Sequence, residues 1–230
     1  MKQTMYLLAA VLLALGLAGG LASWMVWRQS PIAEYNHLIR EGKKGLLGGN
    51  AKGAQQSLGR VLDSLKISDE RVALNFAHAG FIVRQEAGRD DTTQRYSLDT
   101  VRTVYNALGA SPHATLAAVA QNQLGNTEVK FAPPDPAQLE NTLQEAINHY
   151  KNALRKDPAN DSIRYNYELL QRVLNFPNEV LATVDRLVSQ RQYGLAYQFL
   201  ALSRQRDPRL DTYADMEQRL KAIYEIDKQP

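Results

Sequence analysis

Small and bulky residues recur at helical spacing in the stretch EAINHYKNALRKDP, residues 145–158. Ala146, Tyr150 and Ala153 follow one another at steps of four and three, which places them on one face of an α-helix. Asp157-Pro158 ends that helix, because proline cannot continue an α-helix and also restricts the residue before it. The pattern therefore predicts an amphipathic helix that ends at Lys156.

The same spacing recurs elsewhere in the chain. Residues 191–208, RQYGLAYQFLALSRQRDP, again end in a basic residue followed by Asp-Pro. The corresponding positions there are Ala196, Leu200, Ser203 and Pro208. Two weaker copies are Ala54, Leu58 and Val61, followed by Lys66 in place of the proline, and Val101, Tyr105, Leu108 and Pro112. The copies predict a body built from one repeated kind of helix.

A small residue, a bulky residue, a second small residue and a proline at this spacing are typical of the second helix of a tetratricopeptide repeat. The small residues let two antiparallel helices approach closely, the bulky residue fills the space between them, and the proline sets the turn. Each helical hairpin leaves an apolar face uncovered, so the hairpins stack into a solenoid. Strand-like alternation is absent from the pattern, and we expect an all-α body, a divergent TPR-like helical-hairpin solenoid.

The first helices of the expected repeats are less regular. After Pro158, Asp161-Ser162 can cap a helix whose apolar residues are Ile163, Tyr167, Leu170 and Leu174. Residues 177–190, PNEVLATVDRLVSQ, offer a separate apolar set before the copy at 191–208. Residues 70–86, ERVALNFAHAGFIVRQE, are a third candidate. These segments predict divergent repeats.

The N-terminal segment reads differently, because no charge interrupts the run from Met5 to Trp27. That length matches the roughly 20 apolar residues that a helix needs to cross a bilayer. Trp24 and Trp27 stand where an interfacial aromatic belt would fall. The alternative is a signal peptide cleaved near Gly20-Leu21-Ala22. We favour an uncleaved transmembrane anchor over residues 1–27, with the body outside the cytoplasm.

The remaining domain boundaries follow from prolines and glycines. A connector is expected over residues 28–34 and divergent helical repeats over residues 35–124. A proline-rich loop over residues 125–135 would divide the two helical halves. Asp135-Pro136 provides a cap and a first-turn proline, and TPR-like repeats are expected over residues 136–227.

Composition and charge exclude several function classes. The net charge is +3, but basic and acidic residues are interspersed, so no nucleic-acid partner is expected. There is no cysteine, and the four histidines share no metal-ligand spacing. The glycine-rich residues 42–55 fit no phosphate loop, and Gly49-Asn50 is instead expected to form a tight turn. We predict no cofactor, no metal site and no enzyme; catalysis by scattered carboxylates is the weakest hypothesis.

A stacked solenoid binds partners in a groove lined mainly by its first helices. In the helix after Pro158, the expected groove-facing residues are Ser162, Tyr165, Asn166, Leu169 and Arg172. Tyrosine and arginine are the residue types favoured at interface hot spots. The alternative is that these are ordinary solvated or inter-repeat residues.

The segment HYKNALRKDPANDSIRYNYELLQRVL, residues 149–174, carries a family resemblance through Pro158, Asn160, Asp161, Arg164, Tyr165 and Asn166. It resembles the tetratricopeptide accessory proteins encoded beside MoxR-type ATPases and von Willebrand A proteins. These include the Bat aerotolerance group and the K protein of methanol-oxidation operons. The resemblance covers about a tenth of the chain.

The resemblance implies a single-pass protein of a bacterial inner membrane with the bulk of its chain in the periplasm. It also implies an adaptor that works with von Willebrand A-type membrane proteins and a MoxR-type ATPase. Their client in the methanol-oxidation branch is a periplasmic, calcium- and quinone-dependent methanol dehydrogenase, whose maturation includes metal insertion. The alternative is a general cell-envelope scaffold for another system, such as cytochrome or cell-wall biogenesis.

Overall fold

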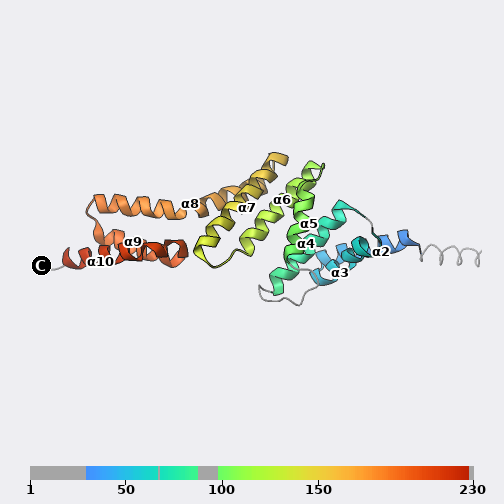
Figure 1. Cartoon of the computed structure of the whole chain (residues 1–230), viewed down its shortest axis with the longest axis horizontal. Coiled ribbons are helices and arrows are strands. Elements are labelled where there is room, and N and C mark those ends of the chain that lie inside the picture. The colour runs from blue at the N-terminus through green and yellow to red at the C-terminus, as the bar shows by residue number, and fades with distance from the viewer. Residues whose placement is uncertain (1–29, 67, 88–97, 228–230) are drawn as a thin grey trace, which may run out of the picture. The chain divides into compact units, whose positions relative to one another are not determined.

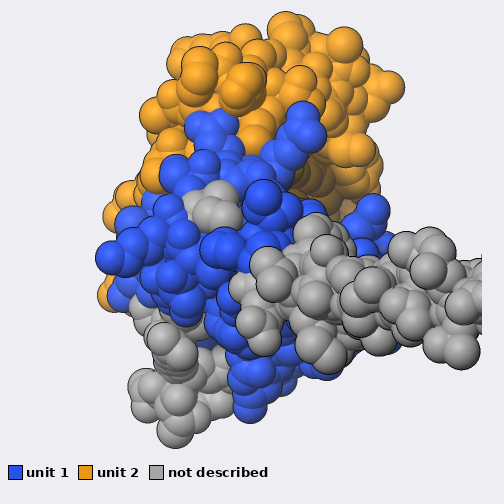
Figure 2. Space-filling model, turned by 90° about the vertical axis from the view of Figure 1, so that its right-hand side faces the viewer, with its two compact units in different colours: residues 1–104 blue, residues 105–230 orange. Residues whose placement is uncertain are grey.

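The computed structural model describes residues 30–66, 68–87 and 98–227. Every regular element in these ranges is helical and none is a strand, so the all-α prediction is confirmed for this part of the chain (Figure 1). None of the helices in the described ranges is both long and apolar enough to span a bilayer. The predicted anchor over residues 1–27 lies outside the described residues. The chain divides into two compact units, residues 1–104 and 105–230 (Figure 2).

The first unit contains helices α2 (Pro31–Leu47), α3 (Ala51–Asp63) and α4 (Glu70–Ala87), and the start of α5 (Leu98–Gly109). The predicted connector over residues 28–34 is wrong from Pro31 onwards. The Ser30 hydroxyl accepts a hydrogen bond from the Ala33 N–H at 3.2 Å, and Pro31 occupies the first helical turn. A proline there loses no helical hydrogen bond, so the helix begins at Pro31 rather than after residue 34.

The predicted tight turn at Gly49-Asn50 is confirmed. Gly49 has a φ of +76°, a conformation that glycine adopts without strain, and the Asn50 side chain caps α3 by accepting from the Gly53 N–H at 2.9 Å. The core of this unit contains Leu58 and Val61 of the repeated pattern. It is completed by residues from α2 and α4: Leu38, Val72 and Phe76.

The second unit begins within α5 and consists of consecutive helices that pack on one another. They are α6 (Ala114–Lys130), α7 (Pro136–Lys156), α8 (Asp161–Ser189), α9 (Tyr193–Arg206), the 3₁₀ helix η1 (Pro208–Tyr213) and α10 (Ala214–Asp227). The repeated small and bulky positions of α7 and α9 are buried, as the spacing predicts. At the end of the unit, the Tyr224 ring of α10 stacks on Tyr197 of α9 with a centroid distance of 6.4 Å.

The proline-rich loop predicted over residues 125–135 is shorter than expected and does not divide the units. Helix α6 continues to Lys130, and only residues 131–135 connect it to α7. Gly125 is buried inside α6, where a Cβ atom would lie 2.5 Å from the Tyr150 ring of α7. This glycine therefore permits close packing of two helices within the second unit, whereas glycine read alone suggested a turn.

A second correction concerns α8. The segments 161–174 and 177–190, which the sequence pattern separates, form one α-helix of 29 residues with Pro177 in its interior. Isolated proline rules predict a boundary there. The helix stays continuous because the Arg209 side chain of η1 donates to the carbonyls of Val173 and Leu174.

Gly125→Ala tests the close packing of α6 on α7. At an open helical position this substitution would stabilise the protein by up to ~1 kcal/mol. Here the added methyl group meets the buried Tyr150 ring, and we expect a loss of ~1–3 kcal/mol in the free energy of unfolding. Denaturant unfolding of the full chain measures the sign. In a Tyr150→Leu background the penalty for Gly125→Ala should fall, and an unchanged penalty would contradict this account.

Candidate protein-binding surface on helix α8

The turn before α8 is fixed by the residues that carry the family resemblance. The Asn160 side chain caps α8 by accepting from the Ile163 N–H at 3.2 Å, and its amide donates to the Asp157 carboxylate at 3.1 Å. Arg164 donates to the Pro158 carbonyl at 2.7 Å and pairs with Asp161 at 3.2 Å. These side chains position the start of α8.

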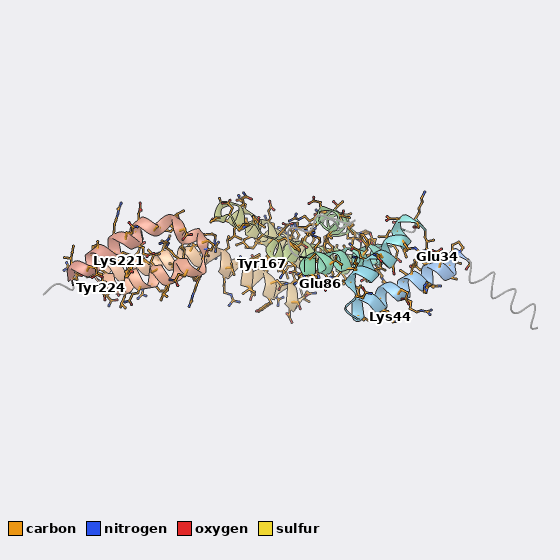
Figure 3. All side chains as sticks on the ribbon, turned by 90° about the horizontal axis from the view of Figure 1, so that it is seen from below. Glu34, Lys44, Glu86, Tyr167, Lys221 and Tyr224 are labelled. Carbon is orange, nitrogen blue, oxygen red and sulfur yellow. The ribbon has the colours of Figure 1, made fainter. Side chains whose placement is uncertain are left out.

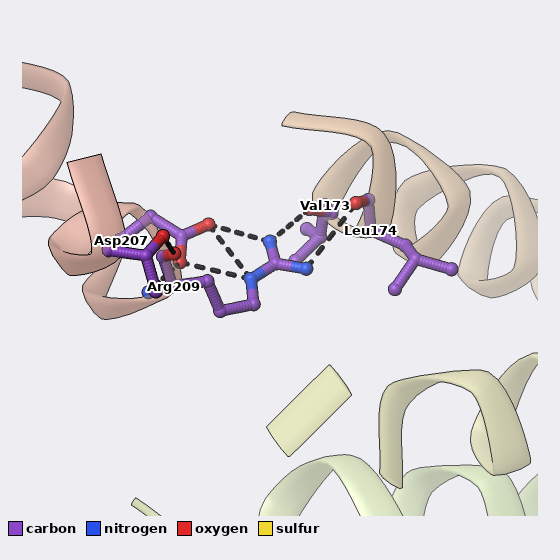
Figure 4. Close-up of polar contacts among 5 residues, drawn as sticks. Val173, Leu174, Asp207 and Arg209 are labelled. Atoms are coloured by element: carbon purple, nitrogen blue, oxygen red, sulfur yellow. Dashed lines mark hydrogen bonds and ion pairs between the residues drawn. The ribbon is translucent and has the colours of Figure 1, made fainter. Parts of the chain in front are cut away.

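Pro177 removes one rung from the hydrogen-bond ladder of α8. Proline has no N–H, so the carbonyl of Val173, four residues earlier, has no donor from its own helix. Arg209 of η1 supplies one: its Nη2 donates to the Val173 carbonyl at 2.6 Å, and its Nη1 donates to the Leu174 carbonyl at 3.3 Å (Figure 4). The helix continues past the proline because a side chain replaces the lost backbone donor.

Asp207 holds the Arg209 guanidinium in place. The Asp207 carboxylate accepts from Arg209 Nη2 at 2.6 Å and from Arg209 Nε at 3.0 Å, and both residues are buried. Burial opposes ionisation of Asp207, but the hydrogen bonds from Arg209 outweigh it and hold the pKa of the carboxyl below its ordinary value. The buried charges are thus paired, and the pair joins η1 to the middle of α8.

One continuous apolar stripe runs along α8. Its residues, which we call the α8 stripe, are Tyr165, Leu169, Val173, Phe176, Val180, Val184 and Leu187. They follow one another at steps of three or four, so they lie on a single face of the helix. A face of this kind is normally covered by another element.

Helix α9 covers only the C-terminal half of the α8 stripe. Val180 and Val184 are 0% and 1% exposed in a core that includes Ala196 and Leu200 of α9. By contrast, Tyr165, Leu169 and Val173 are 60%, 43% and 42% exposed. We call these three residues the open half of the α8 stripe.

The difference in length between the two helices explains the open half. Helix α8 has 29 residues and α9 has 14, which at 1.5 Å per residue corresponds to about 43 Å and 21 Å. Helix α9 ends at Arg206, where Asp207 caps η1 by accepting from the Arg209 N–H at 3.0 Å. The chain turns away there, so no further turn of α9 lies on the rest of the stripe.

The five predicted site residues fall into two groups. Ser162, Tyr165, Leu169 and Arg172 are exposed on α8. Asn166 is instead partly buried, and its amide donates to Asn122 at 3.2 Å and Asn126 at 3.4 Å, both on α6. Asn166 therefore ties α8 to α6, as an inter-repeat residue does.

Tyr150 completes the polar contact behind Asn166. Burial raises the pKa of its hydroxyl to about 12, so the proton stays in place and is donated to the Asn126 side chain at 2.8 Å. The amide side chains beside the open half are thus held in a fixed arrangement.

Sequence reasoning missed two residues of this surface, Val173 and Arg206. A hollow of about 380 Å³ lies where the open half meets the end of α9, lined by Arg172, Val173, Phe176, Glu179, Arg206 and Asp207. Within the described residues, Arg172 and Arg206 form no ion pair. The step of four from Leu169 to Val173 could have revealed Val173, if segments 161–174 and 177–190 had been treated as one helix.

The described ranges also contain histidine and carboxylate side chains outside this surface. No group of three or more histidine and carboxylate side chains there could hold a metal ion. His149 contacts the Gln121 side chain at 2.9 Å between α7 and α6, and burial lowers its pKa. This histidine serves helix packing.

Comparison with known proteins yields no match, whether to a family model, to a curated protein or to a solved structure. The functional inference consequently rests on the residues of the chain itself.

The pairing of Pro177 with Arg209 can be tested by a double-mutant cycle. Arg209→Met should cost ~3–5 kcal/mol, because it leaves the Asp207 carboxylate buried and unpaired. Pro177→Ala gives the Val173 carbonyl a donor from its own helix. In that background we expect the cost of Arg209→Met to fall by ~1 kcal/mol, the value of one hydrogen bond. Thermal unfolding of the four proteins measures the coupling, and strictly additive effects would refute it.

Acid should remove the contribution of Asp207 to stability. A carboxyl group with a depressed folded-state pKa stabilises the fold above its ordinary pKa of 3.8, and the stabilisation is lost as the pH falls through the folded-state value. The stability difference between the wild type and Asp207→Asn should therefore stay constant from about pH 7 to 5 and shrink below about pH 4. Asp185→Asn, which removes one exposed carboxylate from α8, is the control. A difference that does not shrink as the pH falls from about 4 to about 2.5 contradicts the assignment.

Proposed function

We propose that this protein is a helical-repeat adaptor that binds partner proteins through the open half of the α8 stripe. The observation that carries the proposal is the exposure of Tyr165, Leu169 and Val173 in one row, on a helix face that is buried further along at Val180 and Val184. Contiguous exposed apolar surface marks interaction sites in soluble domains. Tyr165 and Arg172 add two residue types that are enriched at binding hot spots.

The proposed architecture is a membrane-anchored, TPR-like solenoid. The buried small and bulky positions of α7 and α9 support it, as does the packing of each helix on the next. The uncharged run from Met5 to Trp27 supports the anchor. In this proposal the body lies in the periplasm of a bacterium and the adaptor is held at the inner membrane.

The proposed partners are a von Willebrand A-type membrane protein, a MoxR-type ATPase system and a periplasmic client enzyme. The resemblance over residues 149–174 supports this choice, and in the methanol-oxidation branch the client is a methanol dehydrogenase that acquires its metal during maturation. The adaptor would position the client. Its own part is recognition of protein surfaces rather than metal chemistry.

Site-specific photo-crosslinking tests the proposed surface. We expect p-benzoylphenylalanine at position 165 or 169, in native membranes, to capture a von Willebrand A protein or a dehydrogenase. The same probe at Lys221, an exposed residue of α10 (Figure 3), should capture neither. Introducing Tyr165→Ala and Arg172→Ala with the probe at 169 should lower capture at least ~10-fold, as expected for hot-spot residues.

Two outcomes count against the proposal. Equal capture from positions 165 and 221 would remove the open half as the binding surface. Capture of an unrelated envelope assembly system from position 165 would refute the proposed partners, while the proposed adaptor function would stand.

A further inference from the structure

The C-terminal half of the α8 stripe shows which kind of element can cover this face. In the C-terminal half, Ala196 and Leu200 of α9 share a core with Val180 and Val184 of α8. The buried residues of α9 follow one another at helical steps of four and three: Ala196, Leu200 and Ser203. An α-helix with small and bulky residues at this spacing is therefore a demonstrated fit to this face.

The open half repeats the surface that α9 covers. Tyr165, Leu169 and Val173 continue the row of Phe176 and Val180 at the same spacing and on the same helix face. The continuity depends on α8 remaining one helix through Pro177, because two helices at an angle would present two unrelated faces. The uncovered surface is thus shaped for the same kind of element as the covered one.

We propose that the open half binds one amphipathic α-helix of a partner protein, seated on α8 in line with α9. This inference rests on the proposed adaptor function and names the kind of segment that the adaptor recognises. An extended peptide would use alternate side chains at about 6.6 Å intervals. The residues of the open half are four apart in sequence, which places them about 6.0 Å from one another along the helix axis. What favours a helix is that α9 covers the continuation of the same row at Val180 and Val184.

The charges at the junction specify one end of that partner helix. Arg172 and Arg206 lie at the hollow where the partner helix would meet the end of α9. Asp207 in the same lining is already paired with Arg209, so Glu179 is the one carboxylate that remains against two guanidinium groups. Helix α9 itself contains no aspartate or glutamate. Charge complementarity therefore assigns an acidic residue to the end of the partner helix that lies over the hollow.

Paired crosslinks can measure the conformation of the bound segment. Positions 165 and 173 are eight residues apart on α8, which corresponds to about 12 Å along the helix axis. The full-length protein is made with p-benzoylphenylalanine at one position or the other, irradiated in native membranes, and the attached partner residues are mapped by mass spectrometry. A bound helix places the two attachment sites about eight residues apart in the partner. An extended segment places them about four residues apart.

Charge reversal tests the acidic end separately. Arg172→Glu and Arg206→Glu should each lower the crosslink yield from position 173 at least ~5-fold at low salt, because each adds repulsion at the hollow. Lys221→Glu, the same charge change on α10, should leave the yield unchanged. Circular dichroism of each variant confirms that the helices remain folded. If both arginine variants give unchanged crosslink yields, the inference of an acidic residue at the end of the partner helix is overturned.

The remaining outcomes separate this inference from the proposed function. Attachment sites about four residues apart would overturn the helical partner while the adaptor function stands. If the only adducts are with a second copy of this chain, the inference that the bound helix belongs to a different protein is overturned. If neither position yields any adduct, the proposed adaptor function itself is refuted.

Discussion

The hydrogen bond from Arg209 to the Val173 carbonyl determines the form of the second unit. Without a donor for that carbonyl, Pro177 would leave a buried or strained backbone group in the middle of α8. With Arg209 in place, the helix extends over 29 residues and takes part in two separate cores. Leu170 belongs to the core formed with α7, and Val184 belongs to the core formed with α9 and α10. A single side chain thus makes one helix the shared element of both cores.

The buried ion pair has a positional role more than a stabilising one. Taking Arg209 and Asp207 out of water costs about as much as their attraction returns. What the pair provides is a fixed position for η1, since the guanidinium group reaches α8 only while Asp207 orients it. That position ends α9 at Arg206 and leaves the open half of the α8 stripe uncovered.

Local rules predicted the elements whose causes are local. The spacing around Tyr150 identified a buried helix face, and Asp135 capped α7 as expected by accepting from the Gln138 N–H at 3.1 Å. The errors arose where the cause is distant in sequence. In the sequence, Pro177 looks like a helix boundary because the donor that compensates for it, Arg209, lies 36 residues from the Val173 carbonyl. Gly125 looks like a loop residue because the ring that requires it belongs to the next helix.

The candidate site shows the same division. Helical spacing was enough to place Tyr165, Leu169 and Arg172 on one exposed surface. It was not enough for Asn166, whose hydrogen-bond partner Asn122 is 44 residues away. Val173 and Arg206 were missed because their place at the surface depends on α8 being continuous and on α9 being short.

Pro177 and Arg209 also constrain the order in which this sequence can change. Replacing the proline first leaves an arginine that still pairs with Asp207 and a helix with its own donor, so that path passes through a stable protein. Replacing the arginine first leaves the Val173 carbonyl without a donor in addition to an unpaired Asp207 carboxylate, whereas replacing it second leaves the unpaired carboxylate alone. We therefore expect the loss of the proline to be tolerated more readily before the loss of the arginine than after it.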